Sequence, residues 1–152
     1  MLRIGICGIP ASGKTTLARA LAARCSKLKK FQRIELVQEY AREYIKVYGN
    51  ITSVLEQFLI LEKQIEKEEV LCNNRLDILI TDSPIFLGFL YSIELPKTSP
   101  KEIMFFNDIF RKMVELNYPT PRYDIIFHLC PTIKPVEDGI RSQIQFNKKL
   151  EK

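Results

Sequence analysis

The stretch LRIGICGIPASGKTT, residues 2–16, joins a short apolar run to a glycine-rich loop. Residues 2–7 are mostly apolar and are followed at once by glycine, which is typical of a strand buried on both faces of a parallel sheet. Beyond the loop, Leu17, Leu21 and Cys25 recur at spacings of four with alanines between them, which predicts a helix packed closely on that sheet. The order strand, loop, helix indicates an α/β domain.

The remaining sequence continues to alternate between strand-like and helix-like segments. Apolar runs that end at turn residues predict strands, and apolar residues at helical spacing predict helices. We predict strands at residues 33–37, 77–81 and 123–129, a helical or irregular segment at 39–44, and helices at 53–72, 105–116 and 141–152. This alternation indicates βαβ units, and so a three-layer α/β fold in which helices flank a mostly parallel sheet.

The length of the chain points to one domain. With 152 residues, 46% of them hydrophobic, it can bury one ordinary core. A fifth strand normally follows the last helix of such a fold, but the sequence ends at residue 152. We therefore expect a single domain over residues 1–152 that is either cut before this strand or a minimal version of the fold.

Composition limits the partners and the compartment. The 23 Lys and Arg residues outnumber the 18 Asp and Glu residues, and the net charge of +5 favours anionic partners such as nucleotides. The cysteines form no CxxC pair, so we expect reduced thiols at Cys7, Cys25, Cys72 and Cys130. No apolar run reaches the roughly 18 residues of a membrane span, and the N-terminal pattern is that of a strand instead of a signal peptide. We therefore expect a cytoplasmic protein with no membrane partner.

The predicted helix at 53–72 begins with a recognisable pattern. Ser53 and Glu56 fit a capping box, in which the two residues satisfy each other's backbone N–H groups. Within this helix we interpret the polar run KQIEKEE, residues 63–69, as the solvent-exposed face.

The loop GIPASGKT fits the pattern GxxxxGK[ST] at every fixed position, between a predicted strand and a predicted helix. Gly8 and Gly13 let the backbone curl so that successive N–H groups converge on a phosphate, and the positive end of the next helix adds a favourable field. Lys14 would reach the β- and γ-phosphates, and the Thr15 hydroxyl would ligate Mg²⁺. The alternative is a glycine-rich turn that matches by coincidence. We predict a triphosphate site formed by Gly8, Ala11, Ser12, Gly13, Lys14, Thr15 and Thr16.

Asp82 follows a predicted buried strand, where a carboxylate can hold Mg²⁺ or activate an acceptor hydroxyl. The alternative is a turn or helix-cap aspartate, which the sequence Asp82-Ser83-Pro84 also fits. Asp82 and Thr15 together form the predicted metal site.

Glu39 also follows a predicted strand, and ligands in open α/β sheets gather beyond the carboxyl ends of the strands. We predict that Glu39 and Arg42 contact the phosphate acceptor. The alternative is that Glu39, Arg42 and Glu43, which lie at helical spacings, form a solvated and self-paired helix face.

Arg141 follows a turn beyond the last predicted strand, the place of a lid whose arginine neutralises charge on a transferring phosphoryl group. The alternative is an ordinary surface arginine. The predicted catalytic residues are then Lys14, Asp82 and Arg141. Several aromatic residues could either stack on a flat acceptor ring or belong to the core, namely Tyr40, Tyr44, Phe86, Phe89 and Tyr91.

Four segments in this order, GIPASGKTT, EYAREY, TDSP and EDGIRS, resemble the ribosylnicotinamide-kinase-like P-loop group. That group includes the kinase domain of bacterial NAD-metabolism regulators and AAA_28-type ATP-binding proteins. The resemblance spans nearly the whole chain and implies a P-loop kinase fold with the sheet order 2-3-1-4-5, which without its fifth strand is 2-3-1-4. It also implies that Glu39 and Arg42 line the acceptor pocket. By the same resemblance, Asp82 serves the metal or the acceptor hydroxyl, and Arg141 belongs to the lid.

Three functions are compatible with these features. The first is an ATP- and Mg²⁺-dependent kinase for a small nucleoside-like or nucleotide-like acceptor, with nicotinamide riboside among the candidates. The second is a nucleotide-dependent switch or NTPase module that acts with a protein partner. The third, which we rank last, is nucleic-acid binding through residues 27–30 and the basic C-terminus. A homo-oligomer is compatible with the sequence.

Overall fold

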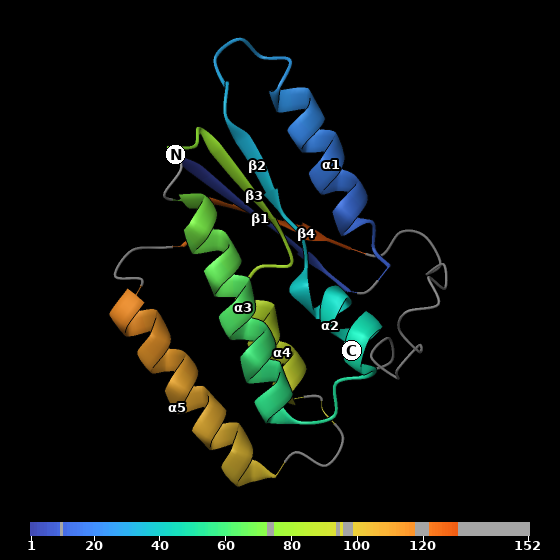
Figure 1. The fold of residues 1–152 in the computed structure, drawn as a ribbon, viewed down its shortest axis with the longest axis vertical. Coiled ribbons are helices and arrows are strands. Elements are labelled where there is room, and N and C mark those ends of the chain that lie inside the picture. The colour runs from blue at the N-terminus through green and yellow to red at the C-terminus, as the bar shows by residue number, and fades with distance from the viewer. Residues whose placement is uncertain (10, 73–74, 94, 96–98, 118–121, 131–152) are drawn as a thin grey trace.

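The computed structural model describes residues 1–9, 11–72, 75–93, 95, 99–117 and 122–130 (Figure 1). Each of the four predicted strands is present, with bounds shifted by two residues or fewer. In chain order the elements are β1 (Leu2–Gly8), α1 (Lys14–Cys25), β2 (Ile34–Val37), α2 (Tyr40–Tyr48), α3 (Val54–Cys72), β3 (Ile78–Asp82), α4 (Phe86–Ile93), α5 (Pro100–Asn117) and β4 (Ile125–Leu129).

The four strands form one parallel sheet in the order β2-β3-β1-β4, which confirms the predicted order. Ile6 of β1 lies opposite Asp82 of β3, and Val37 of β2 lies opposite Thr81 of β3. Because parallel strands run in the same direction, the loops after β1, β2 and β3 leave the sheet at one edge. The predicted site residues in these three loops are thereby brought to the same edge.

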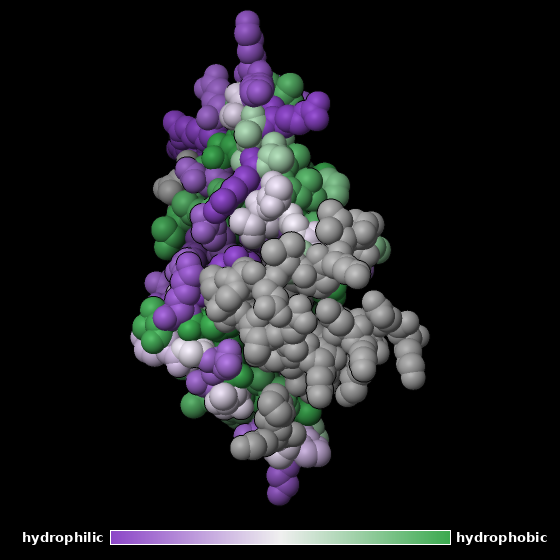
Figure 2. Space-filling view, turned by 90° about the vertical axis from the view of Figure 1, so that its right-hand side faces the viewer, coloured by the Kyte–Doolittle hydropathy of each residue, from purple (hydrophilic) through white to green (hydrophobic). Residues whose placement is uncertain are grey.

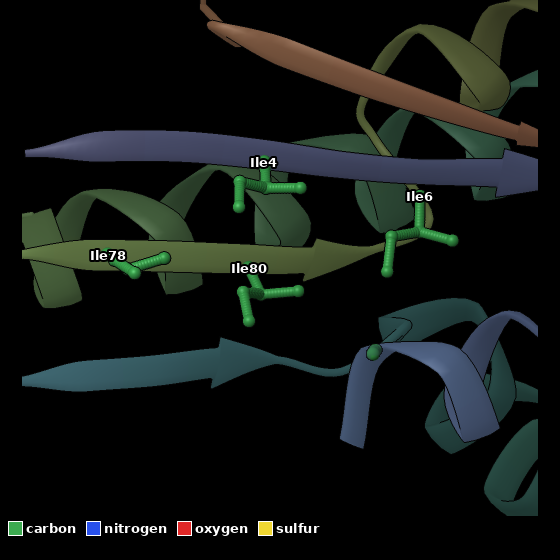
Figure 3. Packing of buried hydrophobic residues seen from close by; sticks show 5 residues of the cluster. Ile4, Ile6, Ile78 and Ile80 are labelled. Atoms are coloured by element: carbon green, nitrogen blue, oxygen red, sulfur yellow. The ribbon is translucent and has the colours of Figure 1, made fainter. Parts of the chain in front are cut away.

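Alternate side chains of the central strands pack on different helices. One buried cluster joins β1, β3 and α1 through Ile4, Ile6, Ile78, Ile80 and Ala18 (Figure 3). Leu79, which lies between the two isoleucines of β3, packs instead in a second cluster that includes Leu71 and Cys72 of α3. Successive strand residues point to opposite faces, so α1 covers one face of the sheet and α3 covers the other (Figure 1). The predicted three-layer architecture is confirmed.

The start of α3 has the predicted capping box. The Ser53 N–H donates to Glu56 Oε2 at 2.9 Å, and the Glu56 N–H donates to Ser53 Oγ at 3.2 Å. The side chains of Ser53 and Glu56 thus each accept a hydrogen bond from a backbone N–H that has no acceptor within the helix.

The interpretation of residues 63–69 as a solvent-exposed face is wrong in part. Gln64 and Glu68 are only 5% and 1% exposed. Gln64 accepts a hydrogen bond from the Tyr40 N–H, and Glu68 accepts one from the Arg122 guanidinium. Because these partners come from distant segments, the local pattern of α3 carries no sign of the burial.

Helix α4 was not predicted. It begins at Phe86, directly after the Asp82-Ser83-Pro84 turn that ends β3. Proline is compatible with this start because the first residues of a helix do not need their N–H groups for helical bonding. The run FLGFLYSI is apolar almost throughout, so it lacks the polar face by which an amphipathic helix is recognised.

Helix α5 begins at Pro100 instead of at residue 105. A second capping box sets this boundary, because the Ser99 N–H donates to Glu102 Oε2 at 2.7 Å and the Glu102 N–H donates to Ser99 Oγ at 3.2 Å. The predicted helix at 141–152 lies outside the described residues.

A lysine-rich loop lies at one end of the molecule. Hydrophilic side chains gather in Figure 2 at the end where the loop between α1 and β2 lies, and Lys27, Lys29 and Lys30 of this loop are exposed. This loop precedes β2, so it lies at the opposite edge of the sheet from the predicted site residues. All four cysteines are free. None of the helices in the described ranges is long and apolar enough to cross a membrane.

Candidate functional site

Two glycines with different constraints shape the loop after β1. Gly8 has a φ of +150°, and a Cβ at this position would lie 2.8 Å from both the Leu129 carbonyl oxygen and Ser12 Oγ. Gly13 has a φ of +89° and open space around it. Glycine is favoured there because the backbone is left-handed, and not because a side chain would lack room. Ala11 also has a positive φ, of 62°. The loop therefore turns sharply between the end of β1 and the start of α1.

The Lys14 side chain reaches back along this loop. Its ammonium group donates to the carbonyl oxygens of Gly8 and Ile9, both at 2.9 Å, and the residue is only 6% exposed. The first helical hydrogen bond of α1 runs from the Leu17 N–H to the Gly13 oxygen, so the N–H groups of residues 14–16 have no acceptor within the helix. A buried ammonium group and the positive end of a helix thus share one loop, which favours an anionic ligand.

Thr15 and Asp82 meet at the same edge of the sheet. Thr15 Oγ1 donates to Asp82 Oδ2 at 2.5 Å and so joins the first turn of α1 to the end of β3. Asp82 is 2% exposed, and no residue in the described part of the chain offers a hydrogen bond to its second oxygen, Oδ1. The aspartate therefore does not act as a turn or helix cap. A buried orphaned carboxylate oxygen is the kind of atom that a bound ion, ligand or water satisfies.

Several charged residues of the predicted site lie around Asp82. Burial raises the pKa of Asp82 above its ordinary value, and the hydrogen bond from Thr15 opposes this rise. The Glu39 carboxylate raises the pKa of Asp82 further, whereas the Lys14 and Arg42 cations lower it. Glu39, Arg42 and Lys14 therefore lie close enough to Asp82 to influence its charge. Lys14, Asp82, and Glu39 together with Arg42 belong to three separate segments of the sequence, and the fold brings these segments together.

Glu39 stands at the N-cap position of α2, but its carboxylate does not cap that helix. The residue is 6% exposed and lines a small pocket between α2, α3 and the segment that follows β3. Glu43 is different, because it is exposed and pairs with Lys67 of α3 at 2.6 Å. Glu43 is therefore solvated, although its partner lies on α3 and not on its own helix, and Glu39 is not solvated.

The candidate aromatic residues separate into two groups. Tyr91 lines the same pocket as Glu39. Phe86 instead packs against Tyr123 with ring centroids 6.3 Å apart, and Tyr44 packs against Tyr48 at 4.8 Å. Of the aromatic side chains placed here, Tyr91 is the one positioned to touch a ligand in this pocket.

A buried ion pair, which no local sequence pattern indicates, supports the Asp82 loop. Arg122 Nε donates to Glu68 Oε2 at 2.7 Å, and the Tyr123 hydroxyl donates to Glu68 Oε1 at 2.9 Å. The same hydroxyl accepts a hydrogen bond from the Ile85 N–H at 3.1 Å. Burial raises the pKa of Tyr123, so the hydroxyl keeps the proton that it donates. Helix α3 and the start of β4 are thereby tied to the loop that follows Asp82.

A family model described as an AAA domain, AAA_28, matches residues 3–151. The chain belongs to this family. The fold of this AAA domain is similar to that of thymidylate kinase from Ehrlichia chaffeensis, with a TM-score of 0.59, 20% identity, and coverage of 85% of this chain and 71% of that chain. No curated protein sequence matches the chain.

Deoxyadenosine kinase from M. mycoides has a similar fold too. With dCMP and a flexible dCDP bound, it matches the AAA domain with a TM-score of 0.54 and 17% identity, and with dATP bound the values are 0.55 and 18%. Both comparisons cover 84% of this chain, which spans only 64% of the deoxyadenosine kinase chain. These likenesses show a P-loop kinase fold.

Two predicted features involve parts of the chain that the structure does not describe. Arg141 and the turn before it lie beyond the described residues, as does the side chain of Phe89. The lid therefore stays a prediction.

Proposed function

We propose that the protein is an ATP- and Mg²⁺-dependent kinase that transfers the γ-phosphoryl group to a small nucleoside-like or nucleotide-like acceptor. One observation carries the proposal: the Thr15 hydroxyl is hydrogen-bonded to the buried Asp82 carboxylate, next to a glycine-turned loop that holds a buried lysine. The fold shared with thymidylate and deoxyadenosine kinases supports it. The resemblance to ribosylnicotinamide kinases adds nicotinamide riboside to the candidate acceptors.

In this proposal the chain contributes position and charge, with no covalent enzyme intermediate. The backbone N–H groups at the start of α1 bind the phosphates. Lys14 exchanges the carbonyl oxygens of Gly8 and Ile9 for phosphate oxygens and so keeps its hydrogen bonds while it neutralises charge. Glu39 and Asp82 lie near each other at the acceptor side, where either carboxylate can accept the proton of an acceptor hydroxyl. Arg141 completes the charge neutralisation from the lid.

The residues present fit Mg²⁺. The Thr15 hydroxyl and the Asp82 carboxylate are hard oxygen donors of the kind this ion prefers, and Asp82 Oδ1 lacks a partner within the described residues. No group of three or more His, Cys, Asp or Glu side chains in the described ranges could hold a metal by itself, so phosphate oxygens and water would complete the coordination. When bound, Mg²⁺ neutralises charge that develops on the phosphoryl group.

A panel of acceptors tests the proposal. We expect the purified protein with Mg·ATP to release ADP in proportion to an added acceptor, drawn from nucleosides, nucleoside monophosphates and nicotinamide riboside. Lys14→Ala should weaken Mg·ATP binding by about tenfold or more, because a charge-assisted contact is lost. Lys27→Ala, which removes an exposed lysine at the opposite edge of the sheet, is the matched control and should bind Mg·ATP normally.

Two results would count against the kinase. Slow ATP turnover that no acceptor accelerates would favour the nucleotide-dependent switch. Unchanged Mg·ATP affinity in Lys14→Ala, measured by calorimetry, would remove the loop from the nucleotide site altogether.

A further inference from the structure

Two buried glutamines of α3 line the pocket beside Glu39. Gln57 and Gln64 are 2% and 5% exposed, and both belong to the pocket wall. Each has one buried amide atom for which the described residues supply no hydrogen-bond partner, Oε1 in Gln57 and Nε2 in Gln64. Buried amide atoms are almost always paired in folded proteins, and leaving one unpaired costs stability. Two such atoms in residues of one pocket wall are atoms that a bound ligand could satisfy.

The backbone fixes which way each amide points. Gln57 Nε2 donates to the Gly88 carbonyl oxygen at 3.4 Å, and Gln64 Oε1 accepts from the Tyr40 N–H at 2.9 Å. If the Gln57 amide were turned over, its oxygen would face the Gly88 carbonyl oxygen, and if the Gln64 amide were turned over, its NH₂ group would face the Tyr40 N–H. The atoms without a partner among the described residues are therefore one hydrogen-bond acceptor, Gln57 Oε1, and one donor, Gln64 Nε2. The two residues are two helical turns apart, or about 10 Å along α3, so their free atoms suit a ligand with polar groups on different sides.

The rest of the wall is apolar and lacks positive charge. Ile60, Leu61, Pro84 and Ile85 contribute hydrocarbon surface, and Tyr91 contributes an aromatic ring. None of the residues that line the pocket in the described part of the chain is a lysine or an arginine, whereas Glu39 is a carboxylate. This wall would repel a phosphate group, and its chemistry suits a flat ring that is uncharged or positively charged.

We propose that this pocket binds the base of a nucleoside acceptor, uncharged or cationic, which donates a hydrogen bond to Gln57 Oε1 and accepts one from Gln64 Nε2. This inference rests on the proposed kinase activity and narrows its acceptor from nucleotides to nucleosides. Glu39 and Ser83, the residue after Asp82, also line the pocket, so a nucleoside bound there would lie next to the segment that carries Asp82. The pocket has about 30 Å³ of room, enough for a water or two, so the walls must move apart to admit a ring.

Gln57→Met and Gln64→Met test the inference with little change of volume. Calorimetry with the full chain, in the presence of Mg·ADP, measures binding of adenosine, cytidine, uridine and nicotinamide riboside and of their 5′-monophosphates. We expect at least one nucleoside to bind more tightly than its monophosphate, and both variants to weaken that binding by about tenfold. The affinity for Mg·ATP should stay within twofold in both variants. Gln32→Met, at an exposed glutamine before β2, should leave nucleoside binding unchanged.

The outcomes separate this inference from the kinase proposal. Nucleoside binding that depends on Gln57 and Gln64, without phosphoryl transfer, would support the pocket and overturn the kinase. Phosphoryl transfer to a nucleoside that neither variant weakens would support the kinase and overturn the pocket, as would tighter binding of monophosphates than of nucleosides. Absence of nucleoside binding to the wild-type protein would also overturn the pocket. Circular dichroism spectra and melting temperatures close to those of the wild type show that the variants are folded.

Discussion

Thr15 Oγ1 and Asp82 Oδ2 are 2.5 Å apart, so a hydroxyl at the start of α1 is bonded to a carboxylate at the end of β3 across a sequence separation of 67 residues. The contact places two oxygen donors, a hydroxyl and a carboxylate, beside the loop that holds Lys14. It also keeps a carboxylate buried, with its second oxygen unpaired among the residues described. A buried carboxylate with an unpaired oxygen lowers the stability of the protein alone, as is common at functional sites.

We therefore expect Asp82→Asn to stabilise the folded protein and to lower its acceptor-dependent turnover. Burial raises the folded-state pKa of Asp82 above the ordinary value of 3.8, so between these two pKa values the folded state binds more protons than the unfolded state. Stability consequently falls as pH rises through this window, and at pH 7 the ionised carboxylate is a net cost. We expect Asp82→Asn to raise the free energy of unfolding by about 0.5–2 kcal/mol at pH 7. Acceptor-dependent turnover should fall by roughly 10²-fold or more.

Thermal unfolding without nucleotide and a coupled ADP assay measure the two effects. Asp108→Asn, at an exposed aspartate of α5, is the control and should change neither quantity. Normal turnover of Asp82→Asn at saturating acceptor would show that the carboxylate is not at the reacting centre.

A pair of glycine substitutions tests the packing behind the same loop. A Cβ on Gly5 of β1 would lie 2.7 Å from Pro84 Cγ, whereas a Cβ on Gly88 of α4 would meet nothing closer than Leu61 Cδ1 at 3.7 Å. Gly5→Ala should therefore push Pro84 out of place and destabilise the protein by about 1–3 kcal/mol. Gly88→Ala should stabilise it by about 0.5–1 kcal/mol, because alanine favours the helix. Urea unfolding of both variants gives the comparison, and equal effects would contradict the packing described.

Glu56 gives a pH-dependent prediction. Its Oε2 accepts from the N–H groups of Thr52 and Ser53 at 2.8 and 2.9 Å, and these bonds, led by the one from Thr52, hold the pKa of Glu56 at about 2 instead of 4.5. A depressed carboxyl pKa stabilises the fold above the unfolded-state value and loses this effect as pH falls toward the folded-state value. Glu56→Gln should cost about 1 kcal/mol at pH 7, and this cost should shrink between pH 4.5 and 2.

Urea unfolding at several pH values measures the effect of Glu56→Gln. Glu62→Gln, on the exposed side of the same helix, should show almost no difference from the wild type at any of these pH values. A cost for Glu56→Gln that does not change with pH would mean that the carboxylate charge is not what stabilises the start of α3.

The features predicted from sequence are those that local chemistry dictates. The loop from Gly8 to Thr15 is recognisable because only certain residues permit its turns and supply its ammonium and hydroxyl groups. The capping box of α3 is likewise a contact between residues three apart. The sheet order followed from the resemblance to a known family, and the fold confirms it.

The features that were missed depend on partners far along the chain. The polar run at residues 63–69 predicts that Gln64 and Glu68 are exposed, because a polar run on a helix usually faces solvent. Their burial depends on the Tyr40 N–H and the Arg122 guanidinium, and only the folded structure reveals these pairings. The sequence gives no sign of the pocket wall beside Glu39 in part for the same reason, since Gln57 and Gln64 lie on that helix.

The buried ion pair behind the site leads to the last prediction. Arg122 Nε and Glu68 Oε2 are 2.7 Å apart, and their side chains are 5% and 1% exposed. Removing one partner leaves a buried charge without compensation, so Arg122→Met should destabilise the protein by about 3–5 kcal/mol. Glu68→Gln with Arg122→Met should recover about 1–2 kcal/mol of this loss, because a neutral amide replaces the stranded charge.

A double-mutant cycle by urea unfolding measures the coupling between Glu68 and Arg122. The control is Arg111→Met, because the partner of Arg111, Asp108, is exposed. Strict additivity of the Glu68 and Arg122 changes would contradict an energetic pairing.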